Sequence, residues 1–259
     1  MMNAEERNDV EAAAFRRDGY LIKRGLASTK KCDELLGIAR EHLDEQMAPI
    51  EYEVDVQYPG SPTSASAEGA DTSRRLLQAY SRHAQLREWA TSREIGSVLR
   101  RLFESDSVEL SQCHHNCIMT KRPGFSSATL WHQDNRYWSF DQQNLVSVWL
   151  ALGNESRVNG CLRVIPGSHR LNIDAGKFDS ALFLRPDLQE NKELIQQSKI
   201  VELNKGDVLF FHSQLFHAAG RNLTDKTKFS LVFTYHESGN RPISDTRSAK
   251  FPSVPVINA

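Results

Sequence analysis

The sequence predicts a mostly β protein in which a sandwich or barrel of strands packs against a helical N-terminal layer. Two observations support this fold class. The N-terminal part spaces its apolar residues as helices do, whereas the rest alternates short runs of β-branched and aromatic residues with turns. The 259 residues are enough for one large core. We expect a single domain over residues 1–259, with a helical scaffold mainly in 1–107 and a β core in about 108–240.

The N-terminal elements follow from apolar spacing and capping residues. A helix is expected from about Ala4 to Gly19, followed by a short strand that ends at Lys23. Ser28-Thr29 is a plausible N-cap for a second helix that runs through about Met47. A third helical stretch, broken near Thr91-Ser92, is expected from Arg74 to Phe103.

The predicted strands begin after residue 107 and are short and regularly spaced, as in sandwiches and barrels. They cover Glu109 to Thr120, Leu145 to Leu152, Leu162 to Ile165, Ile200 to Leu203, Val208 to His212 and Phe229 to His236. Residues from about Asp174 to Gln197 read as a loop with a short helix.

The stretch from Glu51 to Ser73 has no apolar period and is rich in turn-forming residues. A loop of this length in a compact domain is often a lid or a disordered segment. Two interpretations remain open: a mobile flap near a site, or plain surface disorder.

Composition argues against several function classes. The net charge of −1 gives no support for binding to nucleic acid or membranes. No apolar run approaches the roughly 20 residues of a membrane-spanning helix, and the polar, acidic N-terminus is unlike a secretory signal. The four cysteines lack zinc-ribbon spacing, so we expect reduced thiols in a cytoplasmic protein.

The most informative motif is His132-Gln133-Asp134. On an extended strand residues i and i+2 face the same side, so the imidazole and the carboxylate can reach one metal ion. A second imidazole, from His217, would complete the two-histidine, one-carboxylate set of non-heme Fe(II) oxygenases, provided that its strand neighbours the first. His212 is the rival for the distal ligand.

Five sequence blocks resemble the phytanoyl-CoA dioxygenase family, in order and spacing, over about Tyr20 to Glu237. They are Leu130 to Asp134, Val148 to Leu152, Asn159 to His169, Gly206 to His212 and His217 to Asn222. The resemblance implies a double-stranded β-helix (jelly-roll) core, Fe(II), 2-oxoglutarate and O₂. It also implies hydroxylation of a small organic molecule with release of succinate and CO₂.

Carried onto this sequence, the resemblance implies that His132, Asp134 and His217 are the iron ligands. Halogenating relatives carry Gly or Ala at the position of Asp134, so hydroxylation is expected here.

The co-substrate site departs from the family at one position. The family usually has Arg eleven residues after the distal histidine, whereas this chain has Lys228, which can pair with a carboxylate but not as a bidentate fork. Arg221 is a candidate to assist it. The resemblance also puts Trp149 and Cys117 in the 2-oxoglutarate pocket.

Candidate substrate contacts are Asn135 and Tyr137, which come directly after the metal motif, and Arg75, with Arg221 as a further candidate. A solvated charge pair at Arg74-Arg75 and core packing of Tyr137 are the simpler alternatives.

Among the other histidines, one of His114 and His115 could line the pocket, although a solvent or core role is simpler. Two other functions also fit the ligand set: a non-catalytic barrel that binds a metal or small ligand as a sensor or carrier, and a zinc hydrolase.

Overall fold

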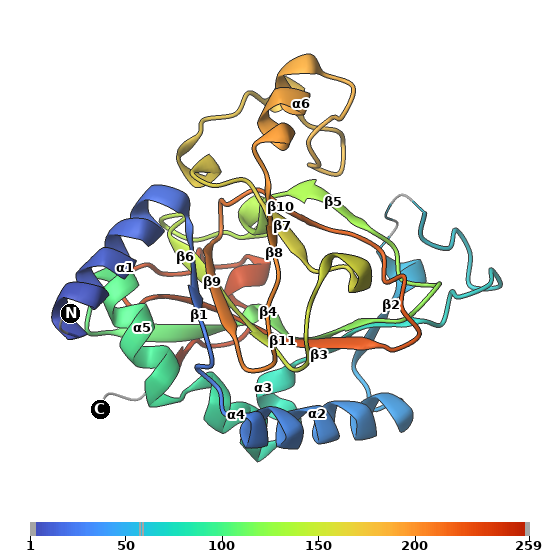
Figure 1. Cartoon of the computed structure of the whole chain (residues 1–259), viewed down its shortest axis with the longest axis horizontal. Helices are drawn as coiled ribbons and strands as arrows, with labels where there is room; N and C mark the ends of the chain where they lie inside the picture. The colour runs from blue at the N-terminus through green and yellow to red at the C-terminus, as the bar shows by residue number, and fades with distance from the viewer. Residues whose placement is uncertain (1–3, 57, 59, 257–259) are drawn as a thin grey trace.

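Two facing antiparallel sheets form the centre of the computed structural model, which describes residues 4–56, 58 and 60–256 (Figure 1). In the described residues the larger sheet has the order β1-β9-β6-β11-β4-β3-β2, with β12 paired to β4, and the smaller sheet has the order β5-β10-β7-β8. The larger sheet consists of β1 (Tyr20–Lys23), β2 (Ile50–Tyr52), β3 (Ser73–Leu77), β4 (Val108–Lys121), β6 (Leu145–Ala151), β9 (Val208–His212), β11 (Lys228–Glu237) and β12 (Val254–Pro255). The smaller consists of β5 (Thr129–His132), β7 (Leu162–Val164), β8 (Lys199–Val201) and β10 (His217–Ala219). This arrangement confirms the predicted jelly-roll class.

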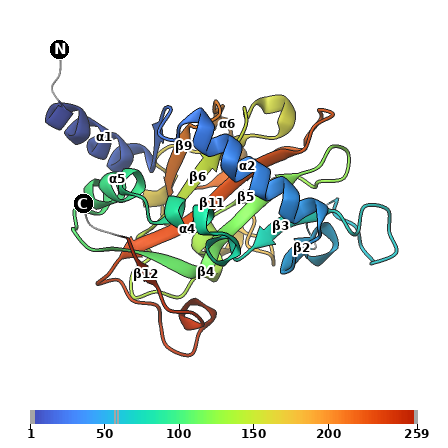
Figure 2. The ribbon, with the colours of Figure 1, turned by 90° about the horizontal axis from the view of Figure 1, so that it is seen from below.

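Helices cover the outer face of the larger sheet, as the two ribbon views show together (Figures 1 and 2). They are α1 (Ala4–Asp18), α2 (Thr29–Asp44), α3 (Ala79–Arg82), α4 (Ala84–Ala90) and α5 (Arg93–Phe103). The predicted N-cap of α2 is confirmed, because the Ser28 hydroxyl accepts a hydrogen bond from the Lys31 amide at 3.1 Å. Short 3₁₀ turns connect other elements: η1 (Glu53–Asp55), η2 (Asp134–Tyr137), η3 (Arg157–Asn159), η4 (Ser168–Arg170), η5 (Ala175–Lys177) and η6 (Arg247–Ala249).

Strand β6 shows why this part of the sequence is apolar at every position except Ser147. All of its residues are buried, because helices cover one face of the larger sheet and the smaller sheet covers the other. Val148 and Leu150 belong to the cluster that includes the helices, whereas Trp149 and Ala151 belong to the cluster between the sheets. The alternation of a strand therefore separates a structural core from an inner face on which a site can form.

The helix predicted from Arg74 to Phe103 is wrong over its first part. Residues Ser73–Leu77 form strand β3, which pairs with β2 on one side and with β4 on the other. Tertiary hydrogen bonding to these strands overrides the local helical pattern. The break predicted near Thr91-Ser92 is confirmed, since the Ser92 side chain caps α5.

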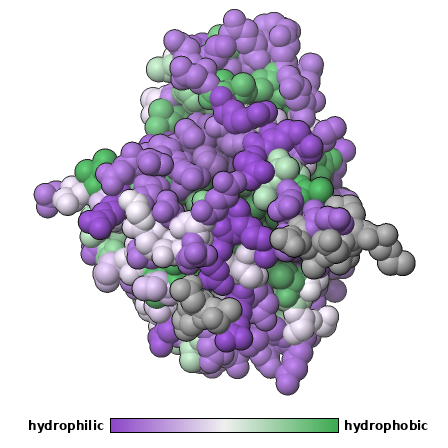
Figure 3. Space-filling model, turned by 90° about the vertical axis from the view of Figure 1, so that its left-hand side faces the viewer, coloured by the Kyte–Doolittle hydropathy of each residue, from purple (hydrophilic) through white to green (hydrophobic). Residues whose placement is uncertain are grey.

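The stretch from about Asp174 to Gln197, predicted as a loop with a short helix, lies in a lobe over the smaller sheet that carries α6 (Gln189–Gln196) (Figure 1). Phe178 and Leu194 pack against a cluster that includes Trp131 and Phe216. Figure 3 shows a mostly hydrophilic surface, with hydrophobic side chains where this lobe joins the rest of the molecule. No helix in the described ranges is long and apolar enough to cross a membrane.

Candidate metal centre

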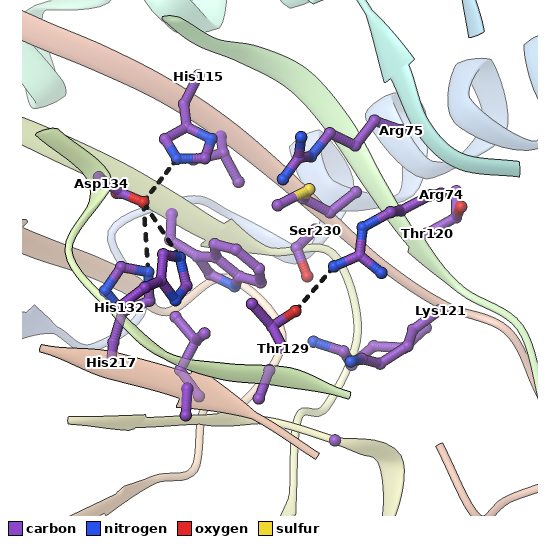
Figure 4. Close-up of a pocket in the computed structure, with 18 of the residues that line it drawn as sticks. Arg74, Arg75, His115, Thr120, Lys121, Thr129, His132, Asp134, His217 and Ser230 are labelled. Carbon is purple, nitrogen blue, oxygen red and sulfur yellow. Dashed lines mark hydrogen bonds and ion pairs between the residues drawn. The ribbon is translucent and has the colours of Figure 1, made fainter. Parts of the chain in front are cut away.

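Strands β5 and β10 bring the two predicted metal-binding histidines together, since His132 and His217 are direct partners in the antiparallel register. Their ring centroids are 4.2 Å apart. Asp134 begins η2 just beyond β5, and its Oδ1 lies 3.7 Å from His132 Nε2 and 3.3 Å from His217 Nε2 (Figure 4). The three donor atoms converge on a common point and can hold one metal ion.

Backbone carbonyls orient both imidazoles. His132 Nδ1 lies 2.8 Å from the Leu130 oxygen, and His217 Nδ1 lies 3.0 Å from the Leu215 oxygen. A carbonyl only accepts, so each Nδ1 carries the proton and each Nε2 presents its lone pair to the centre. Burial and the neighbouring His217 hold the pKa of His132 well below its usual value, which keeps the ring neutral as a metal ligand must be.

Asp134 is fixed by two residues besides His132 and His217. His115 Nε2 lies 2.9 Å from its Oδ1, and the Ser147 hydroxyl donates to its Oδ2 at 3.0 Å. Burial would raise the pKa of Asp134, but His115 and His217 outweigh it and hold that pKa well below its usual value. His115, for which the sequence favours a solvent or core role, therefore belongs to the site; its neighbour His114 stacks on Trp138 instead.

His212, the rival for the distal ligand, lies outside the cluster. Its ring packs against His169 at 5.2 Å, and its Nδ1 accepts from the Gln214 amide at 3.1 Å. The choice of His217 over His212 thus agrees with the geometry.

An inner cavity extends from the triad between the two sheets and is lined by cationic and apolar side chains (Figure 4). Lys228 and Trp149, both predicted for the co-substrate, lie on its wall. Trp149 comes from β6 and Lys228 from the first position of β11, where the Lys228 ammonium lies 5.1 Å from the centroid of the Trp149 ring.

Lys228 is not a free cation. Its Nζ lies 2.8 Å from Oε2 of Glu155, a fully buried carboxylate that no sequence motif singles out. The other Glu155 oxygen accepts from the Trp149 indole at 2.9 Å and from the Ser230 hydroxyl at 2.6 Å. Glu155 therefore fixes three side chains of the inner cavity, and nothing in the local sequence marks it for that position.

Arg74 also lines the inner cavity and is paired. One guanidinium nitrogen lies 3.2 Å from the Glu53 carboxylate, and the other donates to the Thr129 hydroxyl at 2.8 Å (Figure 4). Glu53 lies in the segment interpreted either as a flap or as surface disorder, yet it is completely buried.

An outer cavity of about 530 Å³ opens on the other side of His132 and Asp134. Arg75 and Tyr137, two of the predicted substrate contacts, line it, and Arg75 forms an ion pair with Glu51 at 2.9 Å. Cys117, predicted for the co-substrate pocket, also lines this outer cavity and not the inner one. The outer cavity is thus lined both by residues that precede the metal motif in the sequence, Arg75 and Cys117, and by Tyr137, which follows it.

The segments 51–73 and 174–197 both reach the outer cavity. Arg136 joins them: its guanidinium donates to the Tyr58 hydroxyl at 3.2 Å and to the Ala181 carbonyl at 2.9 Å, and it lies 4.3 Å from the Phe183 ring centroid. Tyr58 belongs to the first segment, and Ala181 and Phe183 to the second.

Two predicted residues are not brought to these cavities. Arg221 is exposed beside Gly60 and lines neither the inner nor the outer cavity. Asn135 also lines neither cavity. Its backbone amide donates to the Ser213 carbonyl at 3.2 Å.

A jelly roll with two histidines and one carboxylate at the mouth of an internal cavity defines the structural class of the non-heme iron oxygenases. Residues 15–230 match the model of the phytanoyl-CoA dioxygenase (PhyH) family, and the chain belongs to that family. This confirms the resemblance drawn from the five sequence blocks.

The curated relatives differ in how much of this chain they share. Human peroxisomal phytanoyl-CoA dioxygenase is 33% identical over 121 residues, which are 42% of this chain and 35% of the human protein. Ectoine dioxygenase of Sphingopyxis alaskensis is 25% identical over 263 residues, 93% of this chain and 81% of that protein. The chain spans about half or less of the length of the rice, Arabidopsis and human phytanoyl-CoA dioxygenases that it matches.

Solved structures share the fold. EctD from S. alaskensis, crystallised with 2-oxoglutarate and 5-hydroxyectoine, is 21% identical with a TM-score of 0.74 over 93% of this chain and 78% of its own. The epimerase SnoN, in complex with Fe³⁺, alpha ketoglutarate and nogalamycin RO, is 22% identical with a TM-score of 0.73 over 92% of this chain and 86% of its own.

Proposed function

We propose that the protein is an Fe(II)- and 2-oxoglutarate-dependent dioxygenase that hydroxylates a small organic molecule and releases succinate and CO₂. The observation that carries the proposal is the convergence of His132, Asp134 and His217 at the junction of two cavities. Bound Fe(II) would supply the activation of O₂ by oxidation of the 2-oxo acid.

The chain's own residues would bind and orient the reactants. His132, Asp134 and His217 would hold the metal on one side and leave the opposite positions open. The inner cavity, with Trp149 and Lys228 on its wall, would bind 2-oxoglutarate. The outer cavity would bind the substrate, with Arg75 and Tyr137 as contacts. Because Asp134 fills the third protein position, hydroxylation is proposed and not halogenation.

The remaining proposals concern the cellular location of the protein and the size of its substrate. The described cysteines are all unpaired and buried, which supports reduced thiols and a cytoplasmic location. The outer cavity suits a small-molecule substrate and not a macromolecule.

Anaerobic reconstitution with Fe(II) and 2-oxoglutarate tests the proposal. We expect a weak visible charge-transfer band that His132→Ala abolishes, and O₂-dependent formation of succinate with a mixed panel of small substrates. Absence of the band in the wild-type protein would overturn the proposal.

One observation supports a second candidate, a non-catalytic barrel that senses or carries a small ligand. The charge of Lys228 is already matched by Glu155, which weakens the expected grip on a 2-oxo acid. Such a protein would form no succinate, not even by the uncoupled reaction in which 2-oxoglutarate is consumed but no substrate is hydroxylated. The same donors suit zinc, so metal analysis of the freshly isolated protein separates a zinc hydrolase from both.

A further inference from the structure

The inner cavity contains a second lysine. Lys121, the last residue of β4, is the direct cross-strand partner of Lys228 on β11, and both side chains are buried on the cavity wall. Like charges at directly opposed positions repel each other, so this pair needs anions nearby. Figure 4 shows Lys121 reaching into the cavity below Arg74 and near Thr129.

The described carboxylates near the inner cavity pair with some of its cationic side chains but not with Lys121. Among the described residues, Glu155 pairs with Lys228, Glu53 with Arg74 and Glu51 with Arg75. The Lys121 ammonium makes no such ion pair in the described part of the chain, and donates only to the Ser127 carbonyl at 3.3 Å. Of the cations that line the inner cavity, Lys121 is thus the one whose charge is not matched within the described residues.

The backbone is shaped around the stem of Lys121. Gly160 has a φ of +75°, and a Cβ at this position would lie 2.9 Å from Lys121 Cδ and 2.5 Å from the Gly220 carbonyl oxygen. A side chain at residue 160 would displace the lysine stem. The backbone carbonyl of Lys121 is also held, because it accepts from the Asn222 amide at 2.7 Å. The position of this ammonium is therefore built into the fold.

We propose that Lys121 neutralises the far carboxylate of 2-oxoglutarate and takes up a proton from solvent when the co-substrate binds. Lys228 lies beside the same carboxylate, with its charge shared with Glu155. The inference rests on the proposed function, because it requires a dianionic 2-oxo acid in the inner cavity. The family resemblance points to Lys228 for this carboxylate and not to Lys121.

The charges around Lys121 explain the proton uptake. Burial, together with Lys228 and Arg74, lowers the pKa of Lys121 to about 7, while Glu53 and Glu155 oppose this in part. At neutral pH a large share of the protein therefore carries a neutral Lys121. A carboxylate that arrives beside it favours the charged form and raises its pKa, so binding draws in a proton. 2-Oxoglutarate is itself fully ionised near neutral pH and does not contribute to this uptake.

Isothermal titration of the anaerobic Fe(II)-loaded protein with 2-oxoglutarate tests the inference. In two buffers of different ionisation enthalpy we expect uptake that approaches one proton per co-substrate at about pH 8. The affinity of the wild-type protein should fall above neutral pH with a slope that approaches about tenfold per pH unit.

Three variants complete the test. Lys121→Met should bind 2-oxoglutarate about 10- to 100-fold more weakly and without proton uptake. Lys121→Arg should retain most of the affinity but lose the uptake, because a guanidinium is always charged. Lys199→Met, at an exposed position on β8, is the matched control and should behave as wild type.

The outcomes separate the two proposals. If wild-type protein binds 2-oxoglutarate without proton uptake, or if Lys121→Met binds it as tightly as wild type does, the inference is overturned and the proposed function stands. If the wild-type protein does not bind 2-oxoglutarate at all, both fail. Should Lys121→Met not fold, the wild-type titration and Lys121→Arg still decide.

Discussion

His132 and His217 are direct partners across the β5–β10 ladder, although 85 positions separate them along the chain (217 − 132 = 85). The two strands belong to the smaller sheet, so the spacing of the two imidazoles is set by backbone hydrogen bonding and not by flexible loops. A site on paired strands holds its ligands more closely than one on loops. The identity of the distal ligand is therefore fixed by the register of this ladder.

His217→Ala should abolish binding of Fe(II), whereas His212→Ala should retain it. The first change removes one of three ligands, and the second removes a ring that packs against His169 away from the centre. Metal content after reconstitution and gel filtration measures the difference. Equal loss of iron in both variants would contradict the assignment of the distal ligand.

His115→Ala should weaken metal binding by about 10- to 100-fold, the range seen when residues that orient a ligand are removed. The reason is that His115 holds Asp134 Oδ1 at 2.9 Å, so the carboxylate loses its orientation without it. Titration with Co(II) monitored by absorbance gives the affinity. His114→Ala is the matched control, because His114 stacks on Trp138 and bonds Ser248; a similar loss in that variant would show that the effect is not specific to Asp134.

Glu155→Gln should lower the free energy of unfolding by about 3 kcal/mol, because it leaves the buried Lys228 ammonium without its counter-charge. The same change should strengthen 2-oxoglutarate binding, since the charge of Lys228 then becomes available to the ligand. Urea unfolding with and without 2-oxoglutarate measures both effects. The exposed Glu88→Gln in α4 serves as control; no change in either quantity for Glu155→Gln would mean that the ion pair is unimportant.

Gly160→Ala should destabilise the protein by about 2 kcal/mol or more, from the cost of a left-handed conformation and the contact with the Gly220 oxygen. Gly37→Ala, in α2 with open space around it, should instead stabilise by about 0.5–1 kcal/mol. Thermal unfolding of the two variants compares them directly. Equal and small shifts would rule out a close approach at residue 160.

The strands and the triad could be predicted from the sequence for physical reasons. Strand β6 is apolar except for Ser147, and the i, i+2 spacing of His132 and Asp134 survives because Gln133 between them is extended. The distal histidine is distinguished in the sequence by its downstream neighbours in the chain and not by geometry, and the β5–β10 ladder agrees with that choice.

Other parts of the site depend on contacts that no local pattern encodes. Ser73–Leu77 is a strand only because β2 and β4 flank it. His114 and His115 are adjacent, so only the tertiary placement of β4 decides which ring meets Asp134. Glu53 and Glu155 are buried by their partners Arg74 and Lys228, and a single sequence gives no sign of such pairs.

The junction made by Arg136 has an evolutionary consequence. This one guanidinium bridges Tyr58 and Ala181, whose segments are remote in sequence. The second segment also contacts β5, because the Leu184 amide donates to the Trp131 carbonyl at 2.9 Å. Tyr58 and Ala181 line the outer cavity and lie outside β5 and β10, so these two positions can change without rebuilding the ligand-bearing strands. The shape of the outer cavity can therefore vary at this rim while the three residues of the metal centre keep their positions.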